Sequence, residues 1–444
     1  MREGHAFRVP AVPEVAPVSP PHLRKEITLR HAVALYISSV LGSGVLVLPG
    51  LAAQIAGPLS LIAWFLLSLG SYPFAYTFAS LSSRRPESGG VYAFAKESFG
   101  LQIATVAGWL FALWFISGGP AVTLIAASYI SYAFPMTRGG SYVIAAGVIL
   151  LAFLINYRGI TFSNRVQVGV VVAIITLLLA AVAFSIGSVQ LQNFVPFAPH
   201  GLLPLGTAAA LIFWSYLGYE NVSNIAEEFR DPKRDFKRSI VLSVLLIGSL
   251  YIAVAIVTVG TGAYKAGGSV APFAAIFSNT MGRYGAVGTA VLVLFIIFGT
   301  VNAYTAGMSR VIYAVARDGG FPRWLHHLNS RTGVPDRSLV TLFGLSILML
   351  GVYFVTEVNL ETALLIPSGA AILVYVIGSA AGIKLLKGHG ERNTFAWISL
   401  IMSLAILPFV GILALVAVFT GLAGLGFLWS AGRRGTRSSD VIEE

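Results

Sequence analysis

Two short polar segments interrupt otherwise apolar stretches of this chain. The first is Gly42-Ser43-Gly44, inside an apolar run from Leu35 to Pro49, and the second extends from Ser215 to Glu220. In lipid, a helix can open only where it lines a cavity or is buried in protein, because no water satisfies its backbone groups. Two openings at corresponding places in the two halves of a chain indicate a central binding site between them.

The first interruption offers a site for an anion. Glycine removes the side chain that would keep a ligand away from the backbone, and each of Gly42 and Gly44 weakens a helix by about 1 kcal/mol relative to alanine. A helix that restarts at Val45 presents free N–H groups and a positive dipole end, which suit a carboxylate. A packing seam of small residues between helices is the alternative interpretation.

The second interruption carries Glu220, which we place at membrane depth, whereas the other 17 of the 18 acidic residues fall in loops or tails. A carboxylate inside a span is costly and usually faces a polar cavity, so Glu220 is a candidate for gating or ion coupling. A poorly hydrated carboxyl group also holds a proton more readily, which makes proton coupling plausible. Alternatively, the span ends near Tyr219 and Glu220 lies at the inner interface.

Composition indicates an integral membrane protein. Only 11% of the 444 residues are charged and 56% are apolar, against about 25% charged residues in soluble domains. The chain has no Cys, and its seven His fall in tails, loops or segment ends. We therefore expect no haem, iron–sulfur or thiolate–zinc cofactor. The net charge of +11 is spread over short loops, which argues against nucleic acid as a partner.

Apolar segments of sufficient length predict an all-α polytopic protein with twelve transmembrane helices in a lipid bilayer. The predicted spans are 31–56, 59–81, 101–131, 141–156, 166–187, 205–225, 238–262, 284–315, 338–356, 360–384, 395–411 and 413–430.

The ends of the chain are predicted to be cytoplasmic tails. Residues 1–30 contain five prolines and no apolar core, which is typical of a flexible tail and not of a signal peptide. Residues 431–444 form the second tail. This topology puts 26 of the 29 Lys and Arg in the cytoplasm and leaves Arg138, Lys265 and Arg283 outside. The positive-inside rule predicts such an asymmetry when both termini are cytoplasmic.

Four separated segments carry a family resemblance. They are GSGVLVLPG at 42–50, RRPESGGVYAFAKESFG at 84–100, FWSYLGYENVSNIAEEFRDPKRDFKRSI at 213–240 and RVIYAVARDGGFP at 310–322. In this order they resemble permeases of the amino acid-polyamine-organocation (APC) superfamily. The sixth span and its surroundings resemble bacterial exporters of methionine and branched-chain amino acids most, and agmatine–arginine exchangers more distantly.

The resemblance implies the five-plus-five inverted repeat of the leucine-transporter fold. Residues 31–187 are then the first repeat, 205–384 the second repeat, and 395–430 two peripheral spans. Spans one and six are the symmetry-related broken helices, in agreement with the interruptions. The implied activity is secondary active transport of amino acids across the cytoplasmic membrane by alternating access, with no enzymatic step.

The resemblance also implies roles for individual residues. The backbone from Ser43 to Val45 takes the substrate carboxylate, while carbonyls near Ser39 and from Trp214 to Leu217 take the ammonium group. Trp214 matches an aromatic gate, for which a packing aromatic is the alternative, and Glu220 matches a gate beneath the substrate. The predicted substrate-binding residues are Ser39, Gly42, Ser43, Gly44, Val45, Trp214, Tyr216, Leu217, Gly218, Phe295 and Phe298.

Substrate preference follows by exclusion. Apart from Glu220, the central parts of spans one, three, six, eight and ten show no ionisable side chain, and Phe295, Phe298 and Trp114 offer apolar surface. A neutral apolar L-amino acid such as methionine or a branched-chain residue fits this composition. A cationic amino acid or a polyamine, moved by antiport, is the alternative, because Glu220 can neutralise a positive charge.

The coupling ion is predicted to be a proton, or coupling is by exchange. Some proton-coupled relatives carry a lysine in span five, but Gln167 to Ala181 contains no basic residue. Proton coupling through such a lysine is therefore disfavoured here, and Glu220 is the candidate proton carrier. Sodium is the alternative, with span-eight hydroxyls as ligands: Thr300, Thr305 and Ser309. A sensor without transport and a membrane enzyme are disfavoured, since the tails are short and the spans hold no catalytic constellation of His and acids. Monomer and homodimer both stay open.

Overall fold

The computed structural model describes residues 28–82, 90–159, 164–220, 232–265, 267–388 and 390–440, and its regular structure there is entirely helical. Nine helical segments within these ranges are long and apolar enough to cross a membrane. The prediction of an all-α polytopic membrane protein is thereby confirmed at this level. The α-helices are α1 (Leu29–Val40), α2 (Leu48–Ala56), α3 (Ser60–Ser82), α4 (Gly90–Phe99), α5 (Leu101–Ala133), α6 (Arg138–Tyr157), α7 (Asn164–Ser185), α8 (Pro204–Ile212), α9 (Pro232–Gly260), α10 (Pro272–Arg317), α11 (Asp336–Val355), α12 (Leu360–Leu385), α13 (Glu391–Ile406) and α14 (Ala414–Asp440).

Helical segments lie in all twelve predicted ranges, although the nine long segments divide the chain differently. One of the nine joins α2 to α3 over Leu48–Leu81, another joins α13 to α14 over Arg392–Ala431, and the short α1 and α8 are not among them. The number of twelve crossings and the inverted repeat therefore stay predictions. Residues 1–27 of the predicted amino-terminal tail lie outside the described residues.

The first interruption is a true break in the helix. α1 ends at Val40, Leu41 is extended, and a single 3-10 turn, η1 (Ser43–Leu46), precedes α2. Gly42 is also extended, with φ −115° and ψ −165°. Pro49 stands in the first turn of α2, where its missing N–H costs no hydrogen bond and its fixed φ suits a helix start.

The second interruption has the same character. α8 passes into the 3-10 turn η5 (Phe213–Tyr216), and Leu217 then adopts an extended conformation. Gly218 follows with φ 118°, a value in the region that glycine alone adopts without steric cost. Both broken helices consequently expose backbone groups inside the protein.

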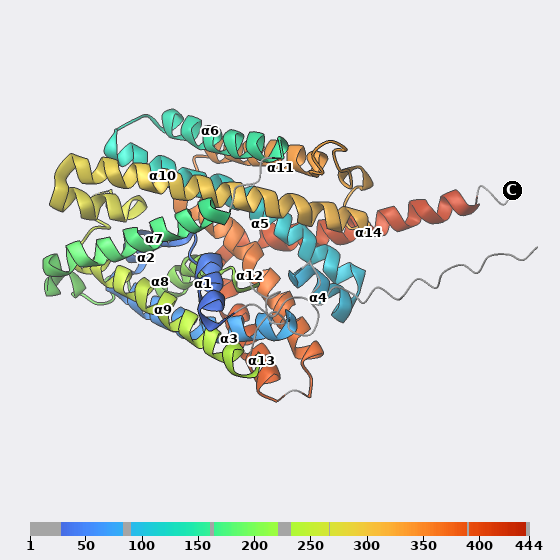
Figure 1. Cartoon of the computed structure of the whole chain (residues 1–444), viewed down its shortest axis with the longest axis horizontal. Coiled ribbons are helices and arrows are strands. Elements are labelled where there is room, and N and C mark those ends of the chain that lie inside the picture. Colours follow the sequence, from blue (N-terminus) through green and yellow to red (C-terminus); the bar gives the residue numbers. More distant parts are fainter. Residues whose placement is uncertain are drawn as a thin grey trace, which may run out of the picture.

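α5 is the central element of the bundle. It packs against α10, α12, α6, α11, α14 and α4, and most of its length is buried. Figure 1 shows α6 and α11 side by side along one edge, next to the long α10, with α3, α9 and α13 toward the opposite edge. α1, α8 and α12 lie between these groups, so that the broken helices occupy the middle of the molecule.

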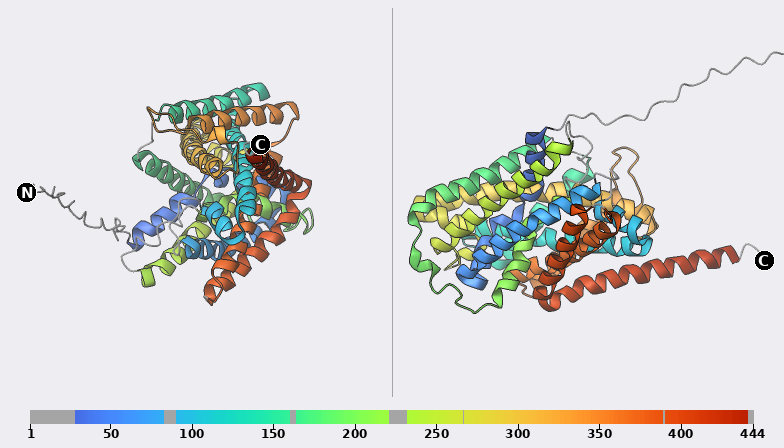
Figure 2. Two further views of the ribbon diagram at one scale, coloured as in Figure 1. Left: turned by 90° about the vertical axis from the view of Figure 1, so that its right-hand side faces the viewer. Right: turned by 90° about the horizontal axis from the view of Figure 1, so that it is seen from below.

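Three details differ from the predicted segments. α4 is a helix in the region expected as the first inner loop. α10 begins well before the predicted start at residue 284, but its backbone breaks at Gly282, where φ is 57°. α14 continues to Asp440, through residues that we expected as part of the carboxyl-terminal tail, and its far end projects from the bundle (Figure 2).

Candidate functional site

The two breaks touch each other. The Ser39 hydroxyl donates to the Gly218 carbonyl oxygen at 2.6 Å. A Cβ atom on Gly218 would lie only 2.3 Å from the Ser39 carbonyl oxygen, so any other residue would push the two segments apart. The structure thus brings Ser39 and Gly218, which the sequence predicted as parts of one site, into direct contact across 179 residues.

A tyrosine of α9 spans both breaks. The Tyr251 hydroxyl lies 3.3 Å from the Val40 carbonyl oxygen and 3.2 Å from the Ser215 carbonyl oxygen. Its ring packs edge-on against Trp64 and Tyr216, with centroids 5.5 and 5.4 Å away. Sequence reasoning missed this residue. A tyrosine in the apolar span 238–262 was a usable signal, because a buried tyrosine hydroxyl usually finds a partner.

Glu220 points into the protein at the second break. Its side chain is 5% exposed, and its Oε2 atom accepts hydrogen bonds from the Gly218 N–H at 2.9 Å and from the Tyr375 hydroxyl at 2.5 Å. The carboxyl group therefore accepts a hydrogen bond from an N–H group that lies at the break. Tyr375, on α12, is a second contact that sequence reasoning missed.

Trp214 fills the space between the first break and α5. A Cβ atom on Gly44 would lie 2.6 Å from its Cδ1 atom, and one on Gly118 would lie 2.7 Å from its Cη2 atom. Trp114 approaches edge-on at 6.1 Å. Gly44 must be small because the indole lies against it, a contact that agrees with both the gate and the packing interpretations of Trp214.

The other predicted residues near the breaks are also buried. Ser43 and Val45 stand in η1, and Leu217 follows η5. The Tyr216 hydroxyl lies 2.6 Å from the Ser68 hydroxyl of α3. Tyr129 of α5 donates to the Leu46 carbonyl oxygen at 2.5 Å, which fixes the end of η1 against α5.

The span-eight residues lie differently from the rest of the predicted site. Phe295 is 42% exposed, and its ring lies near Gly169 of α7; the described contacts do not bring it to the breaks. Phe298 is partly buried against the core. The predicted sodium ligands each donate to a backbone carbonyl of α10 itself: Thr300 to Ile296, Thr305 to Val301 and Ser309 to Ala306.

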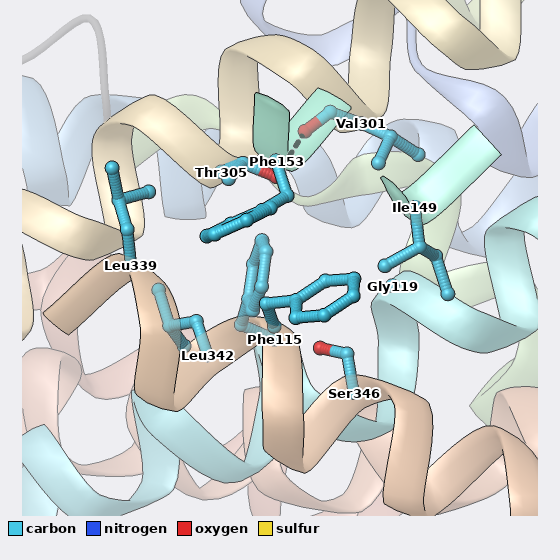
Figure 3. A pocket seen from close by; sticks show the side chains of 10 residues that line it. Phe115, Gly119, Ile149, Phe153, Val301, Thr305, Leu339, Leu342 and Ser346 are labelled. Atoms are coloured by element: carbon cyan, nitrogen blue, oxygen red, sulfur yellow. Dashed lines mark hydrogen bonds between the residues drawn. The ribbon is translucent and has the colours of Figure 1, made fainter. Parts of the chain in front are cut away.

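A small cavity lies on the other side of α5 from Trp214. It is bounded by α5, α6, α10 and α11 and lined mainly by apolar side chains (Figure 3). Gly119 borders this cavity, whereas its neighbour Gly118 contacts Trp214. The cavity and Trp214 therefore lie on different faces of α5. Its lining residues are Phe115, Gly119, Ile149, Phe153, Val301, Thr305, Leu339, Leu342, Phe343 and Ser346.

Another carboxylate, Asp318, lies just past the end of α10 and joins it to α4. Its Oδ2 atom accepts hydrogen bonds from Lys96 at 2.6 Å and from Tyr92 at 3.1 Å. Burial raises the pKa of Asp318, but the hydrogen bonds from Lys96 and Tyr92 and the charges of Lys96 and Arg317 together outweigh burial and hold it below its ordinary value. This acid stays ionised at neutral pH.

Comparison with known proteins places the chain among transporters. Residues 27–431 match the model of a family described as amino acid permease. The chain is similar to an uncharacterised amino acid permease, YecA, of Bacillus subtilis, with 34% identity over 86% of this chain and 89% of the relative. It is also similar to the L-methionine/branched-chain amino acid exporter YjeH of Escherichia coli, with 30% identity over 91% of this chain and 96% of the relative. The branched-chain amino acid permease BcaP of Lactococcus lactis is 27% identical over 90% of both chains.

Proposed function

Because the chain belongs to the amino acid permease family, we propose that it is a secondary active transporter that moves neutral apolar L-amino acids by alternating access. Permeases of this family are transporters and not enzymes, and their substrates are amino acids. The observation that carries the proposal is the direct contact between two helix breaks, at which the backbone of each leaves helical geometry inside the protein. Broken helices of this kind form the substrate sites of many secondary transporters.

The two breaks offer opposite ends for an amino acid. We assign the substrate carboxylate to the N–H groups of Ser43, Gly44 and Val45, which stand in the 3-10 turn η1, because the first N–H groups of such a turn have no partner inside it. α2 itself begins at Leu48 and not at Val45 as the sequence predicted. We assign the ammonium group to carbonyl groups beside Ser39 and from Trp214 to Leu217, where the preceding half-helices end and carry negative partial charge. The Ser215 carbonyl is excepted, because the Tyr251 hydroxyl already contacts it. Gly42 leaves the backbone of the first break open to a ligand, and Gly218 lets the Ser39 backbone approach the second break closely.

The surroundings of Trp214 support an apolar side chain in the substrate. Trp114 meets Trp214 edge-on, and aromatic side chains offer apolar surface to a ligand without requiring a charge. Two of the relatives are named for methionine or branched-chain substrates. A cationic amino acid or polyamine is the second candidate, supported by Glu220, whose buried carboxyl group can neutralise a positive charge.

The membrane arrangement completes the proposal. The protein lies in the cytoplasmic membrane with twelve spans, an inverted repeat over spans one to ten and both termini inside. The positive residues of the inner loops support this orientation. Coupling is by proton or by exchange, and Glu220 is the group that we assign to it, because its carboxyl group is buried at the second break. Sodium, with Thr300, Thr305 and Ser309 as its ligands, is the alternative.

Counterflow in proteoliposomes tests the substrate directly. Vesicles that contain the protein are loaded with one unlabelled compound at a time, from a panel of twenty amino acids and several polyamines, and entry of a labelled amino acid is measured. We expect methionine, leucine, isoleucine and valine to drive uptake. Uptake driven by agmatine or arginine instead supports the cationic alternative, and no uptake with any compound contradicts the proposed function.

A further inference from the structure

Tyr251 occupies a position between the carbonyl ends of both broken helices. Val40 is the last residue of α1, and Ser215 lies in the 3-10 turn that ends α8. The last carbonyl groups of a helix lack partners within that helix and carry its negative dipole end. Two such ends that face one another repel unless a cation or a donor lies between them. The Tyr251 hydroxyl is the donor at this place.

The hydroxyl cannot satisfy both carbonyl groups fully. A tyrosine hydroxyl carries one hydrogen, and the two oxygen–oxygen distances of 3.3 and 3.2 Å are similar and long for an O–H···O bond. The two half-helices thus share a single donor. Such a contact holds the breaks in register and still allows either half-helix to move while the other keeps the bond.

The aromatic surroundings fix the direction of the Tyr251 hydroxyl toward the two carbonyl groups. Tyr251 is fully buried, and its ring lies in a cluster with Trp64 and Tyr216, which contact one another as well. Tyr216 directs its own hydroxyl to Ser68 and the Trp64 carbonyl, away from the breaks. Within this cluster the Tyr216 hydroxyl bonds to α3, whereas the Tyr251 hydroxyl lies at the junction of the two broken helices.

We propose that Tyr251 is a positioning residue that holds the two broken helices together and sets the direction of the carbonyl groups that bind the substrate ammonium group. This inference rests on the proposed function for its substrate, but its structural part does not. The Tyr251 hydroxyl contacts the carbonyl oxygens of Val40 and Ser215. Other carbonyl groups of the breaks then bind the substrate ammonium group. Its hydroxyl also occupies the place where a cation would otherwise neutralise the two helix ends.

The test compares Tyr251→Phe with Tyr353→Phe. Both tyrosines are buried and donate to carbonyl oxygens of two helices, but Tyr353 joins Ser117 of α5 to Ala363 of α12 instead of joining the two broken helices. Loss of a buried hydrogen bond affects both proteins. Only Tyr251→Phe is expected to raise the KM for methionine in exchange, by about tenfold, as loss of a buried donor commonly does, with the maximal rate changed by less than about twofold. A KM unchanged in Tyr251→Phe overturns the proposal.

A second readout does not require transport. The native chain has no Cys, so Ala34→Cys on α1 and Leu242→Cys on α9, both at exposed positions, can carry spin labels without other labelled sites. We expect the distance distribution between the labels to broaden in the Tyr251→Phe background and to stay narrow in the Tyr353→Phe background. Equal widths of the distance distribution in both backgrounds contradict the proposal that Tyr251 holds the two broken helices together. If the native protein moves no amino acid, the proposed function fails while this arm still decides the role of Tyr251.

A conservative replacement covers the case in which Tyr251→Phe does not fold. 4-Aminophenylalanine at position 251 keeps the ring and an N–H donor at its end. We expect this protein to retain a KM for methionine within about threefold of the native value, since the donor is preserved. The proposal is overturned if the 4-aminophenylalanine protein folds and still shows the broad distance distribution and the raised KM that are expected of Tyr251→Phe.

Discussion

The two breaks share one geometry and differ in charge. The first, from Gly42 to Val47, contains only neutral residues and leads into α2. The second carries its own carboxyl group, because Glu220 accepts the Gly218 N–H. An N–H group that already binds a protein carboxylate is less available to a substrate carboxylate. The difference indicates that the substrate carboxylate belongs at the first break, and that the second break serves the ammonium group and the coupling step.

The strongest test of this comparison is to close the first break. In Gly44→Leu even the Cβ atom would lie 2.6 Å from Trp214 Cδ1 and 2.8 Å from Ser215 Oγ, so the added side chain must displace the indole. We expect substrate affinity to fall by at least about a hundredfold, corresponding to a few kcal/mol of overpacking at the site. Ligand-binding and thermal-shift assays measure the affinity and the folded state.

A matched control for this substitution is Gly119→Ala. Gly119 is also a glycine of an apolar helix, but a Cβ atom there meets no atom within 4 Å. Its affinity should stay within about twofold of the native value, because an alanine without a clash is favourable in a helix. Unchanged affinity in a folded Gly44→Leu protein would show that Gly44 belongs to a packing seam and not to the binding site.

The next test removes the charge at the second break. Glu220→Gln keeps the shape and the ability to accept from the Gly218 N–H but cannot ionise. We expect uptake by the native protein to depend steeply on pH between about 5 and 8, and the dependence in Glu220→Gln to fall below about twofold, because glutamine cannot bind the proton that a poorly hydrated carboxyl group holds more readily than a solvated one. Uptake is measured in proteoliposomes with the pH clamped on both sides.

Glu97→Gln serves as the control for charge alone, since Glu97 lies at an exposed position of α4. Its pH profile should match that of the native protein. A Glu220→Gln protein that keeps both its rate and its profile assigns Glu220 a structural role, and coupling then has to involve sodium and the hydroxyl groups of α10.

Competition between substrates sharpens the comparison from the side of the ligand. If the second break accepts an ammonium group and not a second positive charge, methionine, leucine, isoleucine and valine compete for exchange more strongly than arginine, lysine and agmatine. We expect a difference of at least about tenfold, because burying an unpaired charge costs more than burying an apolar side chain gains. Inhibition curves against labelled methionine measure it. Stronger competition by agmatine than by methionine reverses the ranking.

The sequence predicted the breaks well because each depends on local chemistry. Gly42, Gly44 and Gly218 lack side chains, and the polar residues beside them interrupt long apolar runs, so backbone opening follows from residue type alone. The burial of Glu220 could be predicted for the same reason, since it is an acid within an apolar stretch. The helical class and the membrane location followed from composition.

Contacts between distant segments could not be predicted in this way. Tyr251 meets Val40 across 211 residues, and Tyr375 meets Glu220 across 155 residues. Residue type indicates that each buried hydroxyl needs a partner, but it does not say which distant segment supplies that partner. Phe295 depends on the tertiary arrangement in another way. Residue type suggests an apolar pocket wall, but the rotation of α10 about its axis decides which neighbours a phenylalanine meets, and Phe295 is 42% exposed and lies near Gly169 of α7. Its place in the substrate site stays a prediction.

Asp318 provides the smallest expected effect and a reference for Glu220. Because its pKa in the folded protein lies below the unfolded value, its ionic contacts stabilise the fold at every pH above the unfolded pKa of about 3.9 and are lost only as the pH falls through the lower folded value. Asp318→Asn should therefore lower the free energy of unfolding by about 1 kcal/mol, a modest amount because Lys96 is half exposed, and by the same amount at pH 5 and pH 8. Thermal unfolding of the two proteins at both pH values measures the difference. We therefore expect the stability difference between the native protein and Asp318→Asn to be the same at both pH values. If the difference changed between pH 5 and pH 8, steep pH dependence would not distinguish Glu220 from an acid that a lysine and a tyrosine hold ionised.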